Sequence, residues 1–189
     1  MAALCVFCGS SSGSDGVYVA VAEELGRTMA GVGHDLVYGG GHVGLMGVVA
    51  DAALGAGGSV TGVMTEQLVA AEVAHRGLSR LEVTATMHER KARMAELSDA
   101  VIVLPGGFGT LDEAFEIITW NQLGLVAVPV VFLDVGGYFD ALFRFVASSV
   151  EAGFVSERHA ALARRATTVD EALAAVSAPP DRFAPKWLG

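Results

Sequence analysis

Short runs of apolar residues alternate along the chain with longer segments whose apolar positions recur every three or four residues. The short runs are rich in Val, Leu and Ile, and they are continuously apolar, which is typical of strands buried on both faces. They predict strands at Ala3–Cys8, Asp35–Tyr38, Ser59–Met64, Leu81–Thr84, Ala100–Leu104 and Val128–Leu133, with a short strand near Ala166–Thr168.

The longer segments have helical periodicity. They predict helices at Val17–Ala30, Leu45–Leu54, His88–Leu97, Leu111–Leu123, Tyr138–Ala152 and Asp170–Val176. Strands that alternate with helices are typical of βαβ units in a parallel sheet covered on both faces. We therefore expect residues 1–189 to form a single doubly wound α/β domain with a mostly parallel sheet of about seven strands. The tail, 179–189, contains a Pro-Pro pair and should lie on the surface or against a partner.

Composition limits the partners. The formal charge of −9 repels phosphate polymers, so we expect no nucleic acid partner, whereas one helix N-terminus and one or two basic side chains can still hold a single phosphate. No apolar run approaches the roughly 18 residues of a membrane helix, and the start of the chain lacks a basic leader region, so we expect a cytoplasmic protein without membrane contact.

Charged residues make up 17% of the chain and apolar residues 52%, which leaves little charge to cover the surface of a monomer. We interpret this as a homo-oligomer, most simply a two-fold homodimer. A general bias toward Ala, Val and Gly is the alternative explanation of the same counts.

Cys5 and Cys8 form a C-x-x-C pattern, but they fall in a predicted strand rather than at a helix start, where a redox pair gains its low pKa. We therefore expect two buried thiols. The five His are scattered, so no metal-ligand spacing is present and we expect no metal and no organic cofactor.

Three predicted strands are followed by glycine-rich turns, Gly9–Gly13, Gly39–Gly47 and Pro105–Thr110. Glycine lets a backbone approach a phosphate closely, and a helix start offers unpaired N–H groups. Any one turn could be a plain strand-to-helix connection, but three on one sheet indicate a nucleotide or another phosphorylated ligand. No Gly-Lys-Ser/Thr follows, and the first turn does not have the dinucleotide fingerprint, so ATPase and dehydrogenase chemistry are disfavoured.

Thr110 and Glu113 have the T-x-x-E spacing of a capping box at a helix start, which is a purely structural explanation. A carboxylate one turn into a helix that begins at a phosphate loop can also reach a bound sugar. There it can stabilise positive charge on a ribose and orient water, as the cleavage of an N-glycosidic bond requires. The spacing alone does not distinguish the capping role of Glu113 from the catalytic one.

The segment Met87-His-Glu-Arg90-Lys91 lies at the start of the preceding helix, with Arg93 on nearly the same face. A solvated basic helix face is the ordinary interpretation. Basic residues at a helix start oppose the helix dipole, however, so their position favours an anion nearby, which Arg can hold with two hydrogen bonds.

This segment, followed by Pro105-Gly-Gly-Phe-Gly-Thr-Leu-Asp-Glu113, resembles the paired signature of the LOG ("lonely guy") family of phosphoribohydrolases. These enzymes release a free cytokinin base from its riboside 5′-monophosphate. Cys8-Gly-Ser-Ser and Gly39-Gly-Gly-x-x-Gly-Leu-Met-Gly47 extend the resemblance over nearly the whole chain, and it implies a Rossmann-like fold. One departure is Met64-Thr65-Glu66, where many relatives have a Pro, which leaves the shape of that loop open.

The resemblance implies catalytic roles for Arg90 and Glu113. It also implies contacts with the nucleotide from Glu72, Lys91, Gly107, Phe108, Gly109, Thr110, Leu111, Asp112 and Thr119. Glu72 is matched mainly by its spacing, and a solvated carboxylate is its alternative. Thr119 follows Glu113 by six residues, about 120° around a helix, so it should serve a site that a second subunit completes.

The expected reaction is hydrolysis of an adenine nucleoside 5′-monophosphate to the free base and ribose 5-phosphate. Two alternatives stay open, an AMP nucleosidase without cytokinin preference and a carrier that resembles molybdenum-cofactor carriers and has no activity. Proteins of this family were often labelled lysine decarboxylases. We reject that activity here because a pyridoxal enzyme needs a Schiff-base Lys, whereas Lys91 belongs to the phosphate-side motif and Lys186 to the tail.

Overall fold

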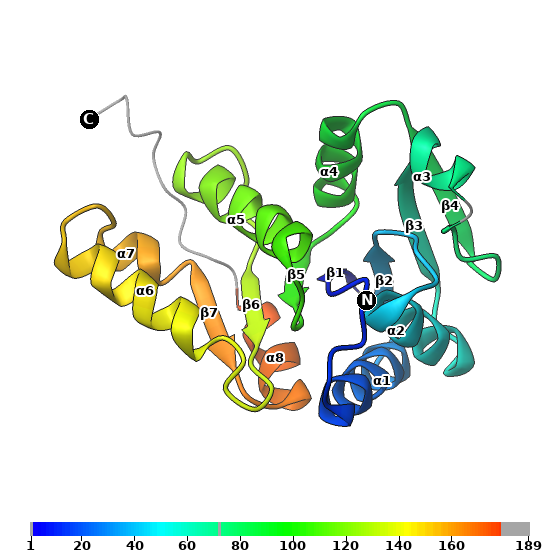
Figure 1. Cartoon of the computed structure of the whole chain (residues 1–189), viewed down its shortest axis with the longest axis horizontal. Helices are drawn as coiled ribbons and strands as arrows, with labels where there is room; N and C mark the ends of the chain where they lie inside the picture. Colours follow the sequence, from blue (N-terminus) through cyan, green and yellow to red (C-terminus); the bar gives the residue numbers. More distant parts are fainter. Residues whose placement is uncertain (1, 72, 179–189) are drawn as a thin grey trace.

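A parallel sheet of seven strands forms the centre of the protein (Figure 1). The computed structural model describes residues 2–71 and 73–178. The strand order is β4-β3-β2-β1-β5-β6-β7, so the chain builds outward from β1 in one direction and then returns to add β5 on its other side. The strands are β1 (Ala3–Phe7), β2 (Asp35–Tyr38), β3 (Val60–Thr65), β4 (Arg80–Thr84), β5 (Ala100–Val103), β6 (Val130–Leu133) and β7 (Ala163–Ala166). The doubly wound α/β fold is thus confirmed.

Helices cover both faces of this sheet. They are α1 (Gly16–Gly31), α2 (Gly44–Gly55), α3 (Glu66–Ala70), α4 (Met87–Glu96), α5 (Phe108–Gln122), α6 (Asp140–Glu151), α7 (Glu157–Ala160) and α8 (Val169–Val176). Side chains of β1 alternate between two cores, as strand geometry requires. Leu4 and Val6 pack with α1, α2 and α8, whereas Cys5 and Phe7 pack with α4, α5 and α6.

The structure departs from the sequence prediction in four places. Helices α3 and α7 are too short to show periodicity, and each begins with a side-chain cap, from Thr65 and Ser156. The departure from the family pattern at Met64-Thr65-Glu66 is therefore a helix start. Strand β7 begins three residues before its predicted start and shares only Ala166 with the prediction, because two arginines in it conceal its strand character. Helix α5 begins at Phe108 and not at Leu111, so part of the third glycine-rich turn is helical.

The three glycine-rich turns leave the carboxyl ends of β1, β2 and β5 and pack against one another. The Gly9 amide donates to the Pro105 carbonyl at 3.0 Å, and the Leu45 amide donates to the Gly9 carbonyl at 3.0 Å. Gly44 has a φ of +59°, and a Cβ there would lie 2.3 Å from the carbonyl carbon of Ser10. The turns therefore form one compact platform beside the point where the strand order reverses, where open α/β sheets bind ligands.

The two cysteines are free and buried, which confirms the prediction of buried thiols. Burial raises the pKa of both thiols well above the ordinary range. Within the described residues, no helix combines the length and apolar character needed to cross a membrane. The predicted tail, 179–189, lies outside the described residues.

Candidate active site

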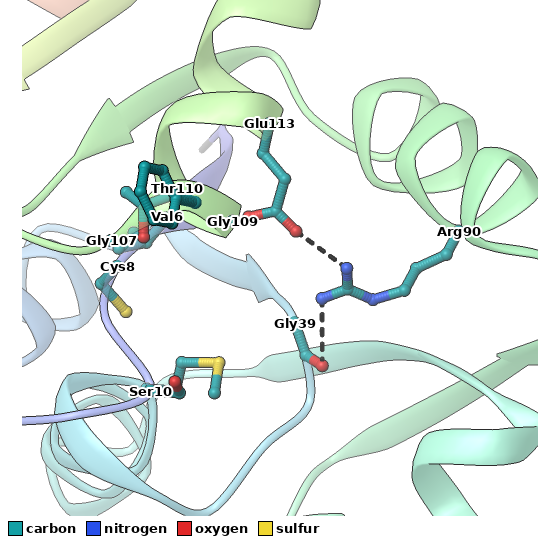
Figure 2. A pocket seen from close by; sticks show the side chains of 11 residues that line it. Val6, Cys8, Ser10, Gly39, Arg90, Gly107, Gly109, Thr110 and Glu113 are labelled. Atoms are coloured by element: carbon teal, nitrogen blue, oxygen red, sulfur yellow. Dashed lines mark hydrogen bonds and ion pairs between the residues drawn. The ribbon is translucent and has the colours of Figure 1, made fainter.

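A cavity of about 230 Å³ opens where the three glycine-rich turns meet α4 and α5. Figure 2 shows Arg90 and Glu113 pointing toward one another there, from two different helices. The cavity is lined by Val6, Cys8, Ser10, Gly39, Met46, Arg90, Gly107, Phe108, Gly109, Thr110 and Glu113. Motifs spread over residues 8–113 of the sequence therefore form one site.

Arg90 is buried, and its guanidinium is held by main-chain oxygens. Nε donates to the carbonyl of Val63 at 2.8 Å, and Nη2 lies 3.4 Å from the carbonyl of Gly39. The side chain is 8% exposed, so the interpretation of a solvated basic face is wrong for Arg90. A Cβ on Gly39 would lie 2.4 Å from Nη2, which explains why the second turn has glycine at this position.

A capping box positions the helix that carries Arg90. The Thr86 hydroxyl accepts from the Glu89 amide at 3.2 Å, and the Glu89 carboxylate accepts from the Thr86 amide at 3.3 Å. This pair has the same T-x-x-E spacing as Thr110 and Glu113. The anionic Glu89 in the first turn also offsets the unfavourable position of the basic residues that follow it.

Glu113 is not part of a capping box. Helix α5 has Gly107 as its N-cap and no side-chain cap, and Thr110 lies inside the helix. The Glu113 carboxylate instead accepts a hydrogen bond from Nη1 of Arg90 at 2.8 Å, and its side chain is 15% exposed. The structural explanation from the sequence is therefore wrong, and the carboxylate lies in the cavity.

The start of α5 leaves several hydrogen-bonding groups without a partner. Within the described residues, the amides of Phe108, Gly109 and Thr110 donate no hydrogen bond. The hydroxyl of Thr110, which is only 4% exposed, makes none either. Since these groups lie at the positive end of a 15-residue helix, they can hold an anion.

Burial and charge act in opposite directions on Glu113. Desolvation raises its pKa above the ordinary value of 4.5, and the charge of Arg90 and its hydrogen bond lower the pKa only in part. Folding thus favours the protonated form, and the stability that this group contributes increases as the pH falls through its folded-state pKa. A carboxylate of this kind is costly to keep ionised, which is typical of functional sites.

Four further predicted residues, Lys91, Leu111, Asp112 and Thr119, lie outside the cavity lining. Lys91 binds Asp112 and Glu116, each at 3.1 Å. Burial lowers the pKa of Lys91, but these two carboxylates outweigh it and raise the pKa above its ordinary value. Leu111 packs against the core, and the exposed Thr119 donates its hydroxyl to the carbonyl of Phe115 at 2.7 Å. The predicted contact Glu72 lies outside the described residues.

The structure adds five residues to the predicted site: Val6, Cys8, Ser10, Gly39 and Met46. Four of them belong to motifs noted in the sequence, Cys8-Gly-Ser-Ser and the second glycine-rich turn. Their position after neighbouring strands was a usable signal, because parallel strands end at the same edge of a sheet. Val6 lies inside a strand, and no sequence pattern distinguishes it from other core residues.

A second cavity of about 270 Å³ adjoins the first and shares Ser10 and Gly107 with it. Its walls include Leu45, Tyr18 and Tyr138, and the two tyrosine rings meet edge to face with centroids 5.8 Å apart. This cavity lies against the first turns of α1 and α2, and both Gly106 and Gly107 line it.

Comparison with known proteins gives consistent relatives. A family profile described as "Possible lysine decarboxylase" matches residues 46–176. The chain is 49% identical over 156 residues to a probable cytokinin riboside 5′-monophosphate phosphoribohydrolase, LOGL9 of Oryza sativa subsp. japonica, covering 82% of this chain and 69% of that one. It is 46% identical over 153 residues to LOG1 of Arabidopsis thaliana, covering 81% and 72%, and 44% identical over 186 residues to LOGL6 of Oryza sativa subsp. japonica, covering 97% and 74%.

Solved structures share the fold. The X-ray structure of TM1055 has a TM-score of 0.69 and 25% sequence identity, covering 94% of this chain and 99% of that one. A molybdenum-cofactor carrier protein of Chlamydomonas reinhardtii has a TM-score of 0.69 and 24% identity, covering 93% and 95%.

Replacing Arg90 should change the titration of Glu113. Arg90→Met removes the cation that lowers the pKa of Glu113, so we expect this pKa to rise further above 4.5. Arg93→Met is the matched control, because Arg93 lies on the same helix but binds Glu82 and Glu96. Carbon-13 NMR titration of the side-chain carboxyls measures both variants. An unchanged or lower pKa of Glu113 in Arg90→Met would contradict the ion pair.

Proposed function

Because this chain belongs to the LOG family of cytokinin riboside 5′-monophosphate phosphoribohydrolases, we propose that it hydrolyses the N-glycosidic bond of an adenine nucleoside 5′-monophosphate. The products are the free base and ribose 5-phosphate. The observation that carries the proposal is the buried pair of Arg90 and Glu113 in a cavity beside the uncapped start of α5.

The start of α5 holds the 5′-phosphate in this proposal. The amides of Phe108, Gly109 and Thr110 and the Thr110 hydroxyl supply four donors, and the helix dipole favours the negative charge. The net charge of −9 does not prevent this, because donors in direct contact outweigh a distant, screened field. The segment from Gly107 to Glu113 then lies along the substrate, from its phosphate to its ribose.

Glu113 acts on the ribose and on water. As the bond from C1′ to N9 lengthens, positive charge develops on C1′ and the ring oxygen, and the ionised carboxylate stabilises it. A water molecule oriented by the same carboxylate forms the new bond to C1′. The electron pair of the broken bond leaves with the base, which takes up a proton, and the proton of the water is lost to the carboxylate or to solvent.

Arg90 favours departure of the base. Its guanidinium has five N–H donors, and Val63, Glu113 and Gly39 take three of them, while the sulfur of Met87 lies 3.4 Å from Nη1. Within the described residues one Nη2 donor therefore has no partner. We assign it to the leaving base, on which negative charge develops as the glycosidic bond breaks.

Two alternatives fit the site less well. The molybdenum-cofactor carrier shares the fold, but its identity to this chain is only 24%, and binding alone gives no reason to bury a carboxylate beside an arginine in the cavity. Lysine decarboxylation through pyridoxal needs a Lys that can deprotonate. Lys91 is instead fixed as a cation between Asp112 and Glu116, and Lys186 lies outside the described residues.

We also propose a cytoplasmic homodimer. Large apolar side chains are exposed on α5, on α6 and after these helices, at Phe108, Leu125, Phe145 and Phe154. Both helices cover the same face of the sheet, and the exposed Thr119 on α5 could complete the site of a second copy. AMP and cytokinin riboside monophosphates are both candidate substrates, because the base would lie at the open mouth of the cavity.

Glu113→Gln should separate catalysis from structure. The amide oxygen can still accept from Arg90, and removing a costly buried charge should leave stability intact. We expect turnover to fall at least about a hundredfold, while the melting temperature and AMP affinity stay close to those of the parent. Glu116→Gln, on the same helix but outside the cavity, should retain turnover. Near-parent turnover of Glu113→Gln would exclude the mechanism.

The phosphate should determine which substrates are cleaved. Each lost charge-assisted hydrogen bond costs about 1.5–3 kcal/mol, so adenosine should have a kcat/KM at least about tenfold to a hundredfold below that of AMP. Thr110→Val removes one hydroxyl at nearly constant volume and should lower kcat/KM for AMP but not for adenosine. Free base is quantified after incubation with adenosine, AMP and isopentenyladenosine monophosphate. Equal turnover of nucleoside and nucleotide would contradict the phosphate site, and no base from any substrate would favour the carrier.

The assembly can be measured by light scattering. A dimer interface should bury at least about 1,000 Å² in total, enough to persist upon dilution. We therefore expect a mass near twice the 19.5 kDa of one chain. Phe145→Ser should shift the mass toward that of a monomer, whereas Val32→Ser, exposed beyond α1 on the other side of the sheet, should not. A monomer mass for the parent at all concentrations would remove the dimer.

A further inference from the structure

A tyrosine from a distant turn contacts the main chain just before α5. The hydroxyl of Tyr138 donates to the carbonyl of Gly106 at 2.6 Å, across 32 residues of sequence. Tyr138 is 43% exposed and lies in the second cavity, not in the cavity of Arg90 and Glu113. Neither the motifs nor the proposed mechanism gives it a role.

The turn that carries Tyr138 is held rigidly. Asp134, whose side chain is fully buried, accepts from the amide of Phe139 at 2.9 Å and also pairs with Arg165 of β7. The Phe139 ring packs edge-on against Phe132, and the Tyr138 ring meets both Phe139 and Tyr18 edge-on. The hydroxyl of Tyr138 is therefore placed by the core and not by the loop that it contacts.

Gly106 has no side chain with which to fix its own peptide, and it has no room for one. A Cβ there would lie 2.1 Å from the Thr110 hydroxyl oxygen and 2.8 Å from the Gly9 amide nitrogen. Glycine therefore allows the loop to approach Thr110 closely, but it also makes the backbone easy to rotate. The hydrogen bond from Tyr138 opposes that rotation.

Peptide geometry links this bond to the cavity. In a trans peptide the C=O of one residue and the N–H of the next point in opposite directions, and the described chain has no cis peptide bond. When the Gly106 carbonyl points to Tyr138, the Gly107 N–H must point away from Tyr138. This amide donates no hydrogen bond within the described residues, and Gly107 lines the cavity of Arg90 and Glu113.

We propose that Tyr138 is a positioning residue that turns the Gly107 N–H toward the 5′-phosphate of the substrate. The inference rests on the proposed function only in naming the phosphate as the acceptor. A hydrogen bond to a carbonyl also polarises its peptide, so the Gly107 N–H becomes a stronger donor. Tyr138 thus acts on the substrate through one peptide group without touching it.

Tyr138→Phe tests this role, because it removes the hydroxyl and keeps the ring. We expect the KM for AMP and the dissociation constant of inorganic phosphate to rise about tenfold, the loss of roughly one good hydrogen bond. The kcat for AMP, the kcat/KM for adenosine and the melting temperature should stay within about twofold or a few degrees of the parent. Tyr18→Phe is the matched control: it loses a hydroxyl in the same cavity that bonds to no described residue, and it should change none of these values.

Calorimetric titration with inorganic phosphate and with AMP separates this proposal from the proposed function, because binding is measured without turnover. If the parent releases no base, weaker phosphate binding by Tyr138→Phe still supports the positioning role. If the parent is active and Tyr138→Phe binds phosphate and AMP like the parent or like Tyr18→Phe, the role is excluded. Equal losses for AMP and adenosine, or a large drop in melting temperature, would show a general structural effect and also overturn the proposal.

Discussion

The site depends on one ion pair formed away from bulk water. The Coulomb energy between Arg90 and Glu113 is larger there than at the surface, but both groups lose hydration, and the raised pKa of Glu113 shows that burial outweighs the attraction. The pair persists because the guanidinium also binds the carbonyls of Val63 and Gly39. A substrate that brings its own charges can therefore change the pKa of Glu113 with little movement of the protein.

The fold makes this pair possible by bringing two halves of the sheet together. Helix α4 packs on β3 and β4, whereas α5 packs on β1, β5 and β6, so the ion pair bridges elements on opposite sides of β2. The glycine-rich turns lie between the two helices, because parallel strands all end at one edge. Main-chain donors at the start of α5 and charged side chains within the cavity are thereby combined at one edge of a single sheet.

Much of this arrangement follows from the sequence. Continuous apolar runs located six of the strands closely, since burial on both faces leaves a strong local signal. Strand β7 was displaced because Arg164 and Arg165, which bind the Ala175 carbonyl and Asp134, interrupt the apolar pattern at the edge of the sheet. The T-x-x-E pattern occurs three times, and only tertiary contacts could tell that it forms a cap at Thr86 and at Thr168, whereas Glu113 faces Arg90. Local spacing is the same in all three, so propensity alone does not distinguish them. Tyr138 carried no signal, because its partner is a carbonyl 32 residues away.

The anchoring of Arg90 by peptide oxygens has a consequence for how such a protein can diverge. A carbonyl belongs to every residue, so substitutions at position 63 cannot delete the acceptor that holds Nε. Position 39 is restricted only by the space that the guanidinium occupies. Substitutions in the supporting strand therefore leave the main-chain anchor of Arg90 in place. Side chains at the cavity mouth, such as that of the almost fully exposed Phe108, can meanwhile vary without disturbing the ion pair. The shape of the cavity can therefore change before either charged group has to change.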